Sequence, residues 1–309
     1  MKKKLYKYSP PDIFDKMFEN NVVNLKCSFP RDYNDPYELF LSIDPENVEL
    51  QYVAYYQEIL ADIPQHPTTC FSKSPNVIPM WAHYARDHSG YVIEVYEDVL
   101  KYNFPEATIQ DMAYSEKTGE VNLGSVAYAY ATGKPRHTYR VMTQAFNAAY
   151  FTKNKCWEYE LERRVVVREI NINQYGEIML LQLPVEAISS IIAGPRASDL
   201  LKQKCKDYAS SIGCKFHHMV IGKSSCVPYF TDEHEVINVF DGNEIVSPLN
   251  KCSICKEPIY SNNPIEKCHW CSVDERLKDY ASYKNPIRML SNLGMLEEYI
   301  NMARSSKTK

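Results

Sequence analysis

Four cysteines near the C-terminal end of the chain form two Cys-x-x-Cys pairs. They are Cys252, Cys255, Cys268 and Cys271, and twelve residues separate the two pairs. Zinc takes four ligands in a tetrahedral arrangement, and a Cys-x-x-Cys turn presents two thiolates to one side of the ion. Because four thiolates leave no open position for a reacting water, the spacing predicts a structural zinc ion in a small ribbon.

Disulfides or redox-active pairs are the alternative for these thiols. The other six cysteines are scattered singly, at Cys27, Cys70, Cys156, Cys205, Cys214 and Cys226. Single, widely spaced cysteines in a large chain without a signal peptide are typical of reduced thiols, which favours zinc over disulfides. His269 lies inside the second pair and could replace one cysteine as a ligand.

A second candidate for chemistry is a row of three glutamates at alternate positions, Glu158, Glu160 and Glu162. The segment is rich in valine and predicts a long strand, on which alternate side chains point to the same face. Carboxylates crowded on one face repel each other, and such groups are where pKa values are tuned for catalysis. The alternative is an exposed face with salt bridges to Arg163, Arg164 and neighbouring strands.

An aromatic stretch at residues 80–90 predicts a helix with Trp81, Tyr84 and His88 on one side. Such stripes more often belong to the core than to a ligand site. His83 and His88 are five residues apart rather than the four typical of helical zinc ligands, so a catalytic metal is not favoured. A third stretch, at residues 29–38, predicts a turn that Asn34 or Asp35 caps.

Hydrophobic periodicity and turn residues predict the elements that would position these groups. Strands are predicted at residues 5–8, 22–26, 68–72, 91–95, 158–170, 178–183, 188–193 and 216–221, and helices at 11–20, 47–61, 78–86, 139–151, 198–211 and 287–303. Gly213 is predicted to end the helix at 198–211. Because helices and strands are mixed without regular alternation or a glycine-rich turn, the fold class is predicted as α+β.

Length and composition predict a main domain at residues 1–245 and a zinc ribbon with a terminal helix at 246–309. The chain has 309 residues, of which 45% are hydrophobic and 24% charged, as in ordinary globular proteins. Residues 251–309 carry ten Lys or Arg against seven Asp or Glu. This basic tail favours an anionic partner such as nucleic acid, although the excess is too small to establish one.

The basic residues at the N-terminus are not followed by the apolar stretch of a signal peptide. No apolar run reaches the length that spans a bilayer. We therefore expect a cytoplasmic protein that has no membrane partner.

Taken together, several motifs resemble the DUF2971 family, a group of uncharacterised bacterial proteins. The motifs are Leu5-Tyr6-Lys7-Tyr8, Phe29 with Asn34-Asp35-Pro36-Tyr37-Glu38, Cys70-Phe71-Ser72, Met80-Trp81-Ala82-His83-Tyr84, His88-Ser89-Gly90 and Trp157-Glu158-Tyr159-Glu160-Leu161-Glu162-Arg163-Arg164. The resemblance spans residues 4–225 and leaves the ribbon outside.

The order of these motifs also resembles that of the ADP-ribosyltransferases, in which a first-strand motif, a strand ending in Ser, an aromatic helix and a Glu-x-Glu strand follow one another. This resemblance implies a mixed-sheet ADP-ribosyltransferase-like main domain with NAD as substrate. Breaking the nicotinamide–ribose bond passes through an oxocarbenium-like species that a carboxylate stabilises. The catalytic residues implied are Glu162, Glu160 and His83. Glu162 or Glu160 would hold a ribose hydroxyl and orient the nucleophile, and His83 would take a proton from the acceptor.

The resemblance also implies a set of NAD-binding residues. Tyr6 and Lys7 would meet the adenosine side or the phosphates, Ser72 would support the carboxylate or the ribose, and Tyr84 or Trp81 would stack on nicotinamide. Lys7 stands where the transferase pattern has Arg or His, and lysine lacks the planar fork of a guanidinium, so this contact would be less directional.

The function implied is that of a bacterial toxin or phage-defence effector that modifies a nucleic acid or a protein, with the ribbon docking the target or a partner. Two alternatives stay open. One is a nuclease whose Glu158, Glu160, Glu162 and Asp35 bind magnesium. The other is a non-enzymatic protein that binds a partner through its ribbon and through the helix at 287–303.

Overall fold

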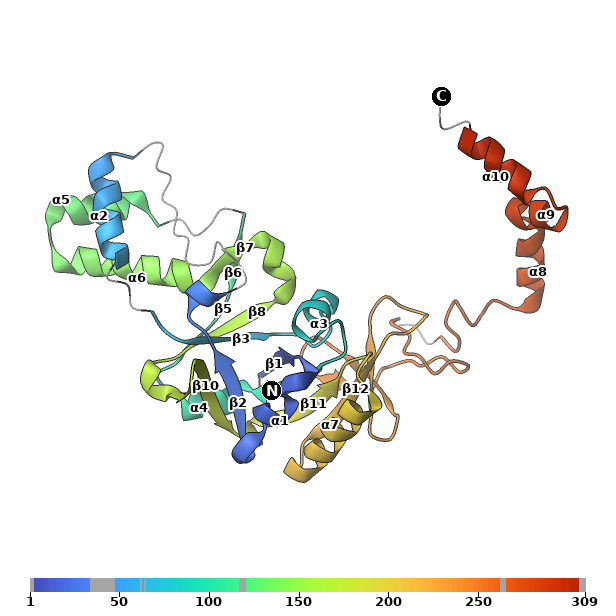
Figure 1. Cartoon of the computed structure of the whole chain (residues 1–309), viewed down its shortest axis with the longest axis horizontal. Coiled ribbons are helices and arrows are strands. Elements are labelled where there is room, and N and C mark those ends of the chain that lie inside the picture. The colour runs from blue at the N-terminus through green and yellow to red at the C-terminus, as the bar shows by residue number, and fades with distance from the viewer. Residues whose placement is uncertain are drawn as a thin grey trace. The chain divides into compact units, whose positions relative to one another are not determined.

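A computed structural model of the chain describes residues 3–33, 48–61, 63, 65–116, 121–261 and 265–305. It confirms the predicted α+β class (Figure 1). The chain divides into two compact units, one of Met1–Val220 with Pro228–Val246 and the other of Ile221–Val227 with Ser247–Lys309. The division into a main domain at residues 1–245 and a ribbon with a terminal helix at 246–309 stays a prediction. Among the described residues, no helix is both long and apolar enough to cross a membrane.

A mixed sheet dominates the first unit and, within the described residues, has ten strands. Their spatial order is β15 (Ile245–Val246), β14 (Ile237–Phe240), β13 (Tyr229–Asp232), β12 (Lys215–Val220), β11 (Ile188–Ala193), β4 (Tyr91–Tyr96), β1 (Lys4–Ser9), β3 (Thr68–Ser72), β8 (Glu162–Val166) and β5 (Thr108–Asp111). Among the described strands of this sheet, only β11 and β12 pair in parallel. Helix α7 (Asp199–Ile212) connects them, because parallel neighbours need a crossover.

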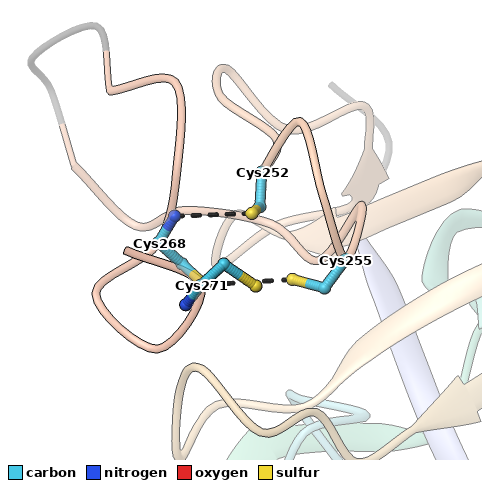
Figure 2. A group of neighbouring side chains, drawn as sticks. All are labelled: Cys252, Cys255, Cys268 and Cys271. Carbon is cyan, nitrogen blue, oxygen red and sulfur yellow. Dashed lines mark hydrogen bonds between the residues drawn. The ribbon is translucent and has the colours of Figure 1, made fainter. Parts of the chain in front are cut away.

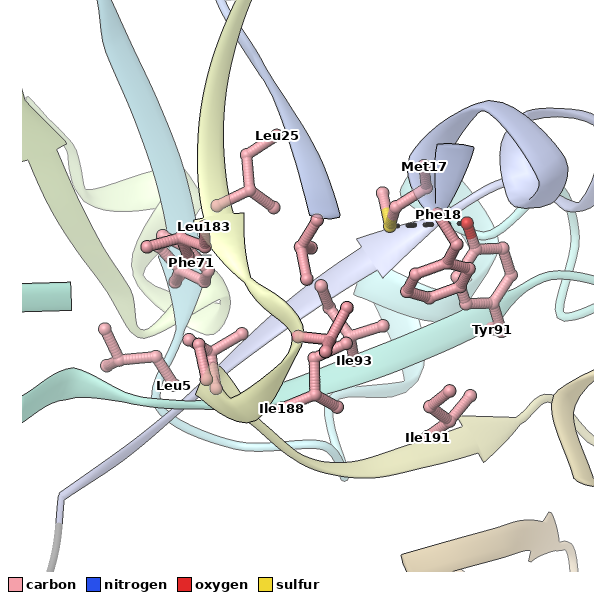
Figure 3. Close-up of a cluster of buried hydrophobic side chains, with 14 of the residues drawn as sticks. Leu5, Met17, Phe18, Leu25, Phe71, Tyr91, Ile93, Leu183, Ile188 and Ile191 are labelled. Carbon is pink, nitrogen blue, oxygen red and sulfur yellow. Dashed lines mark hydrogen bonds between the residues drawn. The ribbon is translucent and has the colours of Figure 1, made fainter. Parts of the chain in front are cut away.

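A second, antiparallel sheet contains β2 (Val22–Cys27), β10 (Ile178–Pro184) and β9 (Ile172–Tyr175). The largest core cluster joins this sheet to the first one: Leu25 and Leu183 pack with Leu5 and Phe71, and all four are buried (Figure 3). Removing this apolar surface from water is the main force that holds the two sheets together. A short parallel pair, β6 (Ala113–Ser115) with β7 (Thr152–Asn154), completes the strands.

Strands β1 and β3 pair at a single position, Tyr6 opposite Ser72. On its other side β1 pairs with β4 along its whole length, and β3 pairs with β8 from Thr68 to Ser72. The large sheet is therefore continuous through β1 and β3, but a single residue pair joins these two strands. The separation of these two strands leaves room for the cleft described below.

Three helices form a separate packed group in the first unit: α2 (Leu50–Ala61), α5 (Leu123–Thr132) and α6 (Pro135–Phe151) (Figure 1). The other α-helices in the described part of the unit are α1 (Phe14–Met17), α3 (Ile78–Tyr84), α4 (Glu97–Asn103) and α7. Ser198 caps α7 by accepting a hydrogen bond from the amide of Leu201, and Gly213 ends it with φ of 72°. The predicted glycine stop is confirmed, because glycine adopts the left-handed conformation without a Cβ clash.

The predicted strand at 158–170 is wrong at both ends, because β8 stops at Val166 and a 3-10 helix covers Glu169–Asn171. A 3-10 helix covers Lys155–Glu160, Leu161 adopts a left-handed conformation with φ of 48°, and β8 begins only at Glu162. The side chain of Asn154 caps the 3-10 helix by accepting a hydrogen bond from the amide of Cys156. The 3-10 helix forms here in place of the strand that the alternating pattern predicts, because the Asn154 side chain readily hydrogen-bonds to the backbone that follows it.

Two predicted helices are interrupted. The helix predicted at 11–20 consists of a 3-10 turn, the four residues of α1 and a second 3-10 turn with Asn20 at φ of 61°. The helix predicted at 287–303 is two helices, α9 (Pro286–Asn292) and α10 (Leu296–Ser305), separated by Gly294 at φ of 72°. These two and α8 (Glu275–Tyr283) belong to the second unit, and none of the three has a buried residue.

Candidate functional site

The first unit contains a cleft of about 650 Å³ beside the junction of β1 and β3. Its volume lies within the range of small-molecule sites. The lining comes from β1, β3 and β8, from β2 and β10 of the second sheet, and from α3 and the 3-10 turn before β8. The charged, polar and aromatic side chains that line it include Lys7, Lys16, Lys26, Cys70, Ser72, Tyr84, Lys153, Trp157, Glu160, Glu162 and Arg164.

Glu162 is a buried, ionised carboxylate at this cleft, only 3% exposed. Its Oε1 accepts a hydrogen bond from Nε of Arg164 at 2.8 Å, and its Oε2 lies 3.2 Å from Nζ of Lys153. Burial opposes ionisation, but Arg164 and Lys153 outweigh it and lower the pKa of Glu162 to about 2. Burial and the charge of Glu162 raise the pKa of the Cys70 thiol to about 12.

Glu160 is the second buried carboxyl group of the cleft, also 3% exposed. Its Oε1 accepts a 2.6 Å hydrogen bond from the hydroxyl of Tyr84, and its Oε2 accepts one of 2.7 Å from Nζ of Lys153. Burial raises the pKa of Glu160 in spite of Lys153 and Tyr84. The two carboxyl groups share one lysine, yet their environments move their pKa values in opposite directions, as in acid–base pairs of enzymes.

Local structure explains why both carboxyl groups reach the same place. Register fixes Glu162 opposite Ser72 on β3, and the left-handed Leu161 turns the chain between the two glutamates. The carbonyl of Leu161 accepts a hydrogen bond from the amide of Lys73, which ties the turn to the end of β3. Glu158 lies in the same turn but is exposed, so the predicted row of three glutamates on one face is wrong.

The alternative prediction, an exposed glutamate face with salt bridges to Arg163 and Arg164, is wrong for Glu160 and Glu162, which are buried, although Glu162 does pair with Arg164. Arg163 forms its salt bridges on the other side of β8. Arg163 binds Glu97 through two hydrogen bonds of 2.7 and 2.8 Å and Asp111 through one of 2.7 Å. These carboxylates come from α4 and β5. Since side chains alternate along a strand, Arg163 serves this structural network while Glu162 and Arg164 face the cleft.

The predicted NAD-binding residues are in part brought together. Tyr6, Lys7, Ser72 and Tyr84 line the cleft. Nζ of Lys7 donates to Oγ1 of Thr69 at 3.0 Å and to the carbonyl of Cys70 at 2.9 Å, and burial lowers its pKa. Burial raises the pKa of Tyr6. The catalytic and binding roles of these side chains stay predictions.

Three residues of the aromatic stretch, Trp81, His83 and His88, are not among the lining residues of the cleft. Trp81 is completely buried in the core, where its Nε1 donates to the carbonyl of Pro75 at 2.8 Å. His83 is exposed and is not part of the described lining. Helix α3 ends at Tyr84, so His88 lies beyond it with φ of 70° and is not on its stripe. Residues 34–38 of the remaining motif lie outside the described residues.

Sequence reasoning missed Lys153, the group that joins the two carboxylates. It lies on β7, directly after α6, and its ammonium is 4.9 Å from the ring centre of Trp157. Only 8% of its side chain is exposed. A lysine seven residues before a glutamate is an ordinary spacing, so only the three-dimensional path of the chain reveals the contact.

In the second unit, the four predicted zinc ligands come together. Their sulfur atoms all lie within 4.8 Å of one another, and two of them, from Cys255 and Cys268, are 3.9 Å apart (Figure 2). The amide of Cys268 donates to the sulfur of Cys252 at 3.4 Å, and the amide of Cys271 donates to that of Cys268 at 3.4 Å. The four cysteines could therefore hold a metal ion such as zinc. Among the described residues, no other group of three or more His, Cys, Asp or Glu side chains is close enough together to hold a metal ion.

Residues 80–165 match one protein-family model. Its description is "Protein of unknown function (DUF2971)". The matched segment runs from α3 to β8, so it contains both carboxyl groups of the cleft together with Tyr84, Lys153 and Arg164. Lys7, Ser72 and the cysteine cluster lie outside it. No curated protein and no solved structure matches the chain.

Proposed function

We propose that the cleft of the first unit binds NAD, breaks its nicotinamide–ribose bond and transfers ADP-ribose to a macromolecular acceptor. The observation that carries this proposal is the pair of buried carboxyl groups, Glu160 and Glu162, whose pKa values are moved apart at the wall of one cleft. Reactions through oxocarbenium ions use such pairs, because one group must stay anionic while the other exchanges a proton.

Glu162 is the anion in this scheme. As the bond between ribose C1′ and the pyridinium nitrogen breaks, its electron pair goes to that nitrogen and neutral nicotinamide leaves. Positive charge develops on the ribose, where an ionised carboxylate in a site of low dielectric stabilises it. Arg164 and Lys153 keep Glu162 ionised across the physiological pH range.

Glu160 is the proton acceptor. A hydroxyl or amino group of the acceptor attacks C1′, and the proton that it loses passes to the Glu160 carboxylate. The raised pKa of Glu160 makes it a stronger base than an ordinary glutamate, which general-base catalysis near neutral pH requires. The bonds of Glu160 to Tyr84 and Lys153 hold it in position.

The remaining lining supports a dinucleotide. Lys7, Lys16 and Lys26 supply positive charge for the two phosphates. Lys7 uses two of its three N–H donors on the protein, so one is left for a ligand. Tyr84 and Trp157 offer aromatic faces for nicotinamide or adenine.

NAD labelled in its adenylate half, incubated with the full chain and with candidate nucleic acids and proteins, tests the proposal. We expect nicotinamide release and label on an acceptor with the wild type, and a loss of about 100-fold or more with Glu162→Gln. Glu158→Gln is the matched control, because Glu158 is the exposed glutamate of the same turn. The proposal fails if the wild type releases no nicotinamide with any acceptor, or if Glu162→Gln equals the wild type.

The two alternatives draw less support. A magnesium nuclease needs free carboxylate oxygens, whereas Glu160 and Glu162 both bind Lys153 and Glu158 is exposed. Asp35 lies outside the described residues. A protein that only binds partners through its ribbon would not require two buried carboxyl groups at a cleft, since burying unneeded charge is costly.

We further propose that the four cysteines hold a structural zinc ion. Four thiolates around one point fill its coordination shell, and backbone amides already donate to two of the sulfurs. Glu257 orders the adjacent chain by accepting hydrogen bonds from the amides of Lys223 and Ser224. One zinc per chain by elemental analysis supports this assignment, and a metal-free chain with folded residues 247–305 contradicts it.

A further inference from the structure

Thirty-one consecutive residues, 121–151, contain no aspartate or glutamate, although the chain has 39 acidic residues in 309. This segment forms helices α5 and α6 and the turn between them. It does contain Lys134, Arg136 and Arg140, together with His137. Although the chain has a net charge of −4, the charged side chains of this helical hairpin are all basic.

The cations lie at the N-terminal end of α6, where the partial positive charge of the helix makes them unfavourable. Lys134 is the N-cap residue, Arg136 lies in the first turn and Arg140 one turn further on. No ion pair joins these three to a carboxylate of the described residues, and Nε of Arg136 instead donates to Nε2 of His137 at 3.2 Å. Burial and the cations Arg136, Lys134 and Arg140 lower the pKa of His137.

The outer face of α6 continues this surface in a polar form. Arg136, Arg140, Thr143 and Asn147 follow at the spacing of one helix face, and all are exposed. The opposite face is buried, with Val141 and Ala145 completely inaccessible in the helical core. Because the outer face lacks large aliphatic side chains at 143 and 147, it does not have the apolar band that a membrane-binding helix inserts.

Two exposed tyrosines stand beside the cations. Tyr139 is 71% exposed and lies between Arg136 and Arg140 on α6. Tyr128 of α5 is 57% exposed, and its ring centre is 4.7 Å from that of His137. Cations next to exposed aromatic rings are the combination with which proteins bind single-stranded nucleic acids, through phosphate contacts and base stacking.

We propose that the α5–α6 hairpin binds single-stranded nucleic acid, with Lys134, Arg136 and Arg140 on phosphates and Tyr128 and Tyr139 stacking on bases. Helix α6 has 17 residues, about 25 Å of length, and its C-terminal end leads directly to β7 and Lys153 of the cleft. A strand held at the N-terminal end of α6 is thus within a few nucleotides of the carboxyl groups. This binding is independent of the proposed reaction.

Fluorescence anisotropy with a labelled 20-nucleotide single strand, measured with the full chain over a range of salt concentrations, tests the surface. We expect log K to fall with log salt with a slope of about −2, as three phosphate contacts on a single strand give. Arg136→Glu/Arg140→Glu should weaken binding on the order of tenfold or more at low salt. Tyr139→Ala should weaken it about fivefold or more and leave the slope unchanged.

Lys202→Glu/Lys206→Glu is the matched control, because these lysines have the same four-residue spacing on α7 of the same unit. It should bind like the wild type, as should Glu162→Gln, which separates this surface from the proposed chemistry. Circular dichroism of each variant verifies its fold. Equal affinity of the wild type and Arg136→Glu/Arg140→Glu would overturn the proposal, as would binding of an acidic peptide or anionic vesicles in place of the single strand.

Discussion

The cleft of the first unit and the cysteine cluster of the second are two charged sites built in opposite ways. In the cleft, carboxylates on β8 and on the turn before it meet cations from β7 and β8 and a tyrosine from α3. In the cluster, all four ligands come from two short turns with twelve residues between them. The cleft depends on the packing of a whole unit, whereas the cluster depends on its own turns and on the proposed zinc ion. Damage to the one should therefore leave the other intact.

The largest effect is expected for Cys268→Ser. Structural zinc contributes on the order of 10–16 kcal/mol of apparent binding free energy in small metal domains, so the variant should lose its metal and the fold of residues 247–274. The first unit should keep its own thermal transition. Elemental analysis and calorimetry measure both effects.

Cys226→Ser is the matched control, since Cys226 is an exposed cysteine of the same unit outside the cluster. It should keep both the metal and the transition. If Cys268→Ser also unfolded the first unit, the two regions would not be independent.

The next effect is acid destabilisation of the first unit through Glu162. Its pKa is about 2 in the folded protein against 4.5 for the ordinary side chain, so its contribution is present above 4.5 and is lost as pH falls towards 2. At about 1.4 kcal/mol per pKa unit, this contribution is roughly 3 kcal/mol. Urea unfolding at pH 2 to 6 measures it, and Glu162→Gln should flatten that part of the curve.

Lys153→Met should alter the pH dependence of turnover. Without the shared ammonium group, both Glu160 and Glu162 lose a nearby cation and their pKa values should rise. The acid limb of the pH profile of nicotinamide release should therefore move to higher pH. Lys155→Met, at an exposed lysine two residues on, should leave the profile in place; a common profile for all three proteins would rule out the shared-lysine network.

The smallest effect is expected at a helix cap. Ser198→Ala removes the hydroxyl that accepts the Leu201 amide at the start of α7 and should cost the first unit about 1 kcal/mol. Asp274→Ala removes the corresponding cap of α8 in the second unit. Each change should lower the melting transition of its own unit alone, and a joint shift would show coupling between the units.

The same contrast explains what could be predicted from the sequence. The cysteine cluster was found from spacing, because its geometry is contained in two local turns. Strands such as β3 and the glycine stop of α7 were also predicted, since their signals are local. The cleft cannot be predicted in this way, because it depends on contacts between distant parts of the chain. Strands β1 and β3 pair only where Tyr6 lies opposite Ser72, and Lys153 follows the end of α6. Glu160 and Glu162 were singled out on a strand pattern that the Asn154 cap interrupts.

The most direct test is nicotinamide release from NAD, with an acceptor present, by the wild type, Glu162→Gln and Cys268→Ser. With chemistry confined to the cleft, Cys268→Ser should stay within about twofold of the wild type, while Glu162→Gln loses about 100-fold or more. Equal release by Glu162→Gln and the wild type, or no release by any of the three, would contradict the assignment of the cleft.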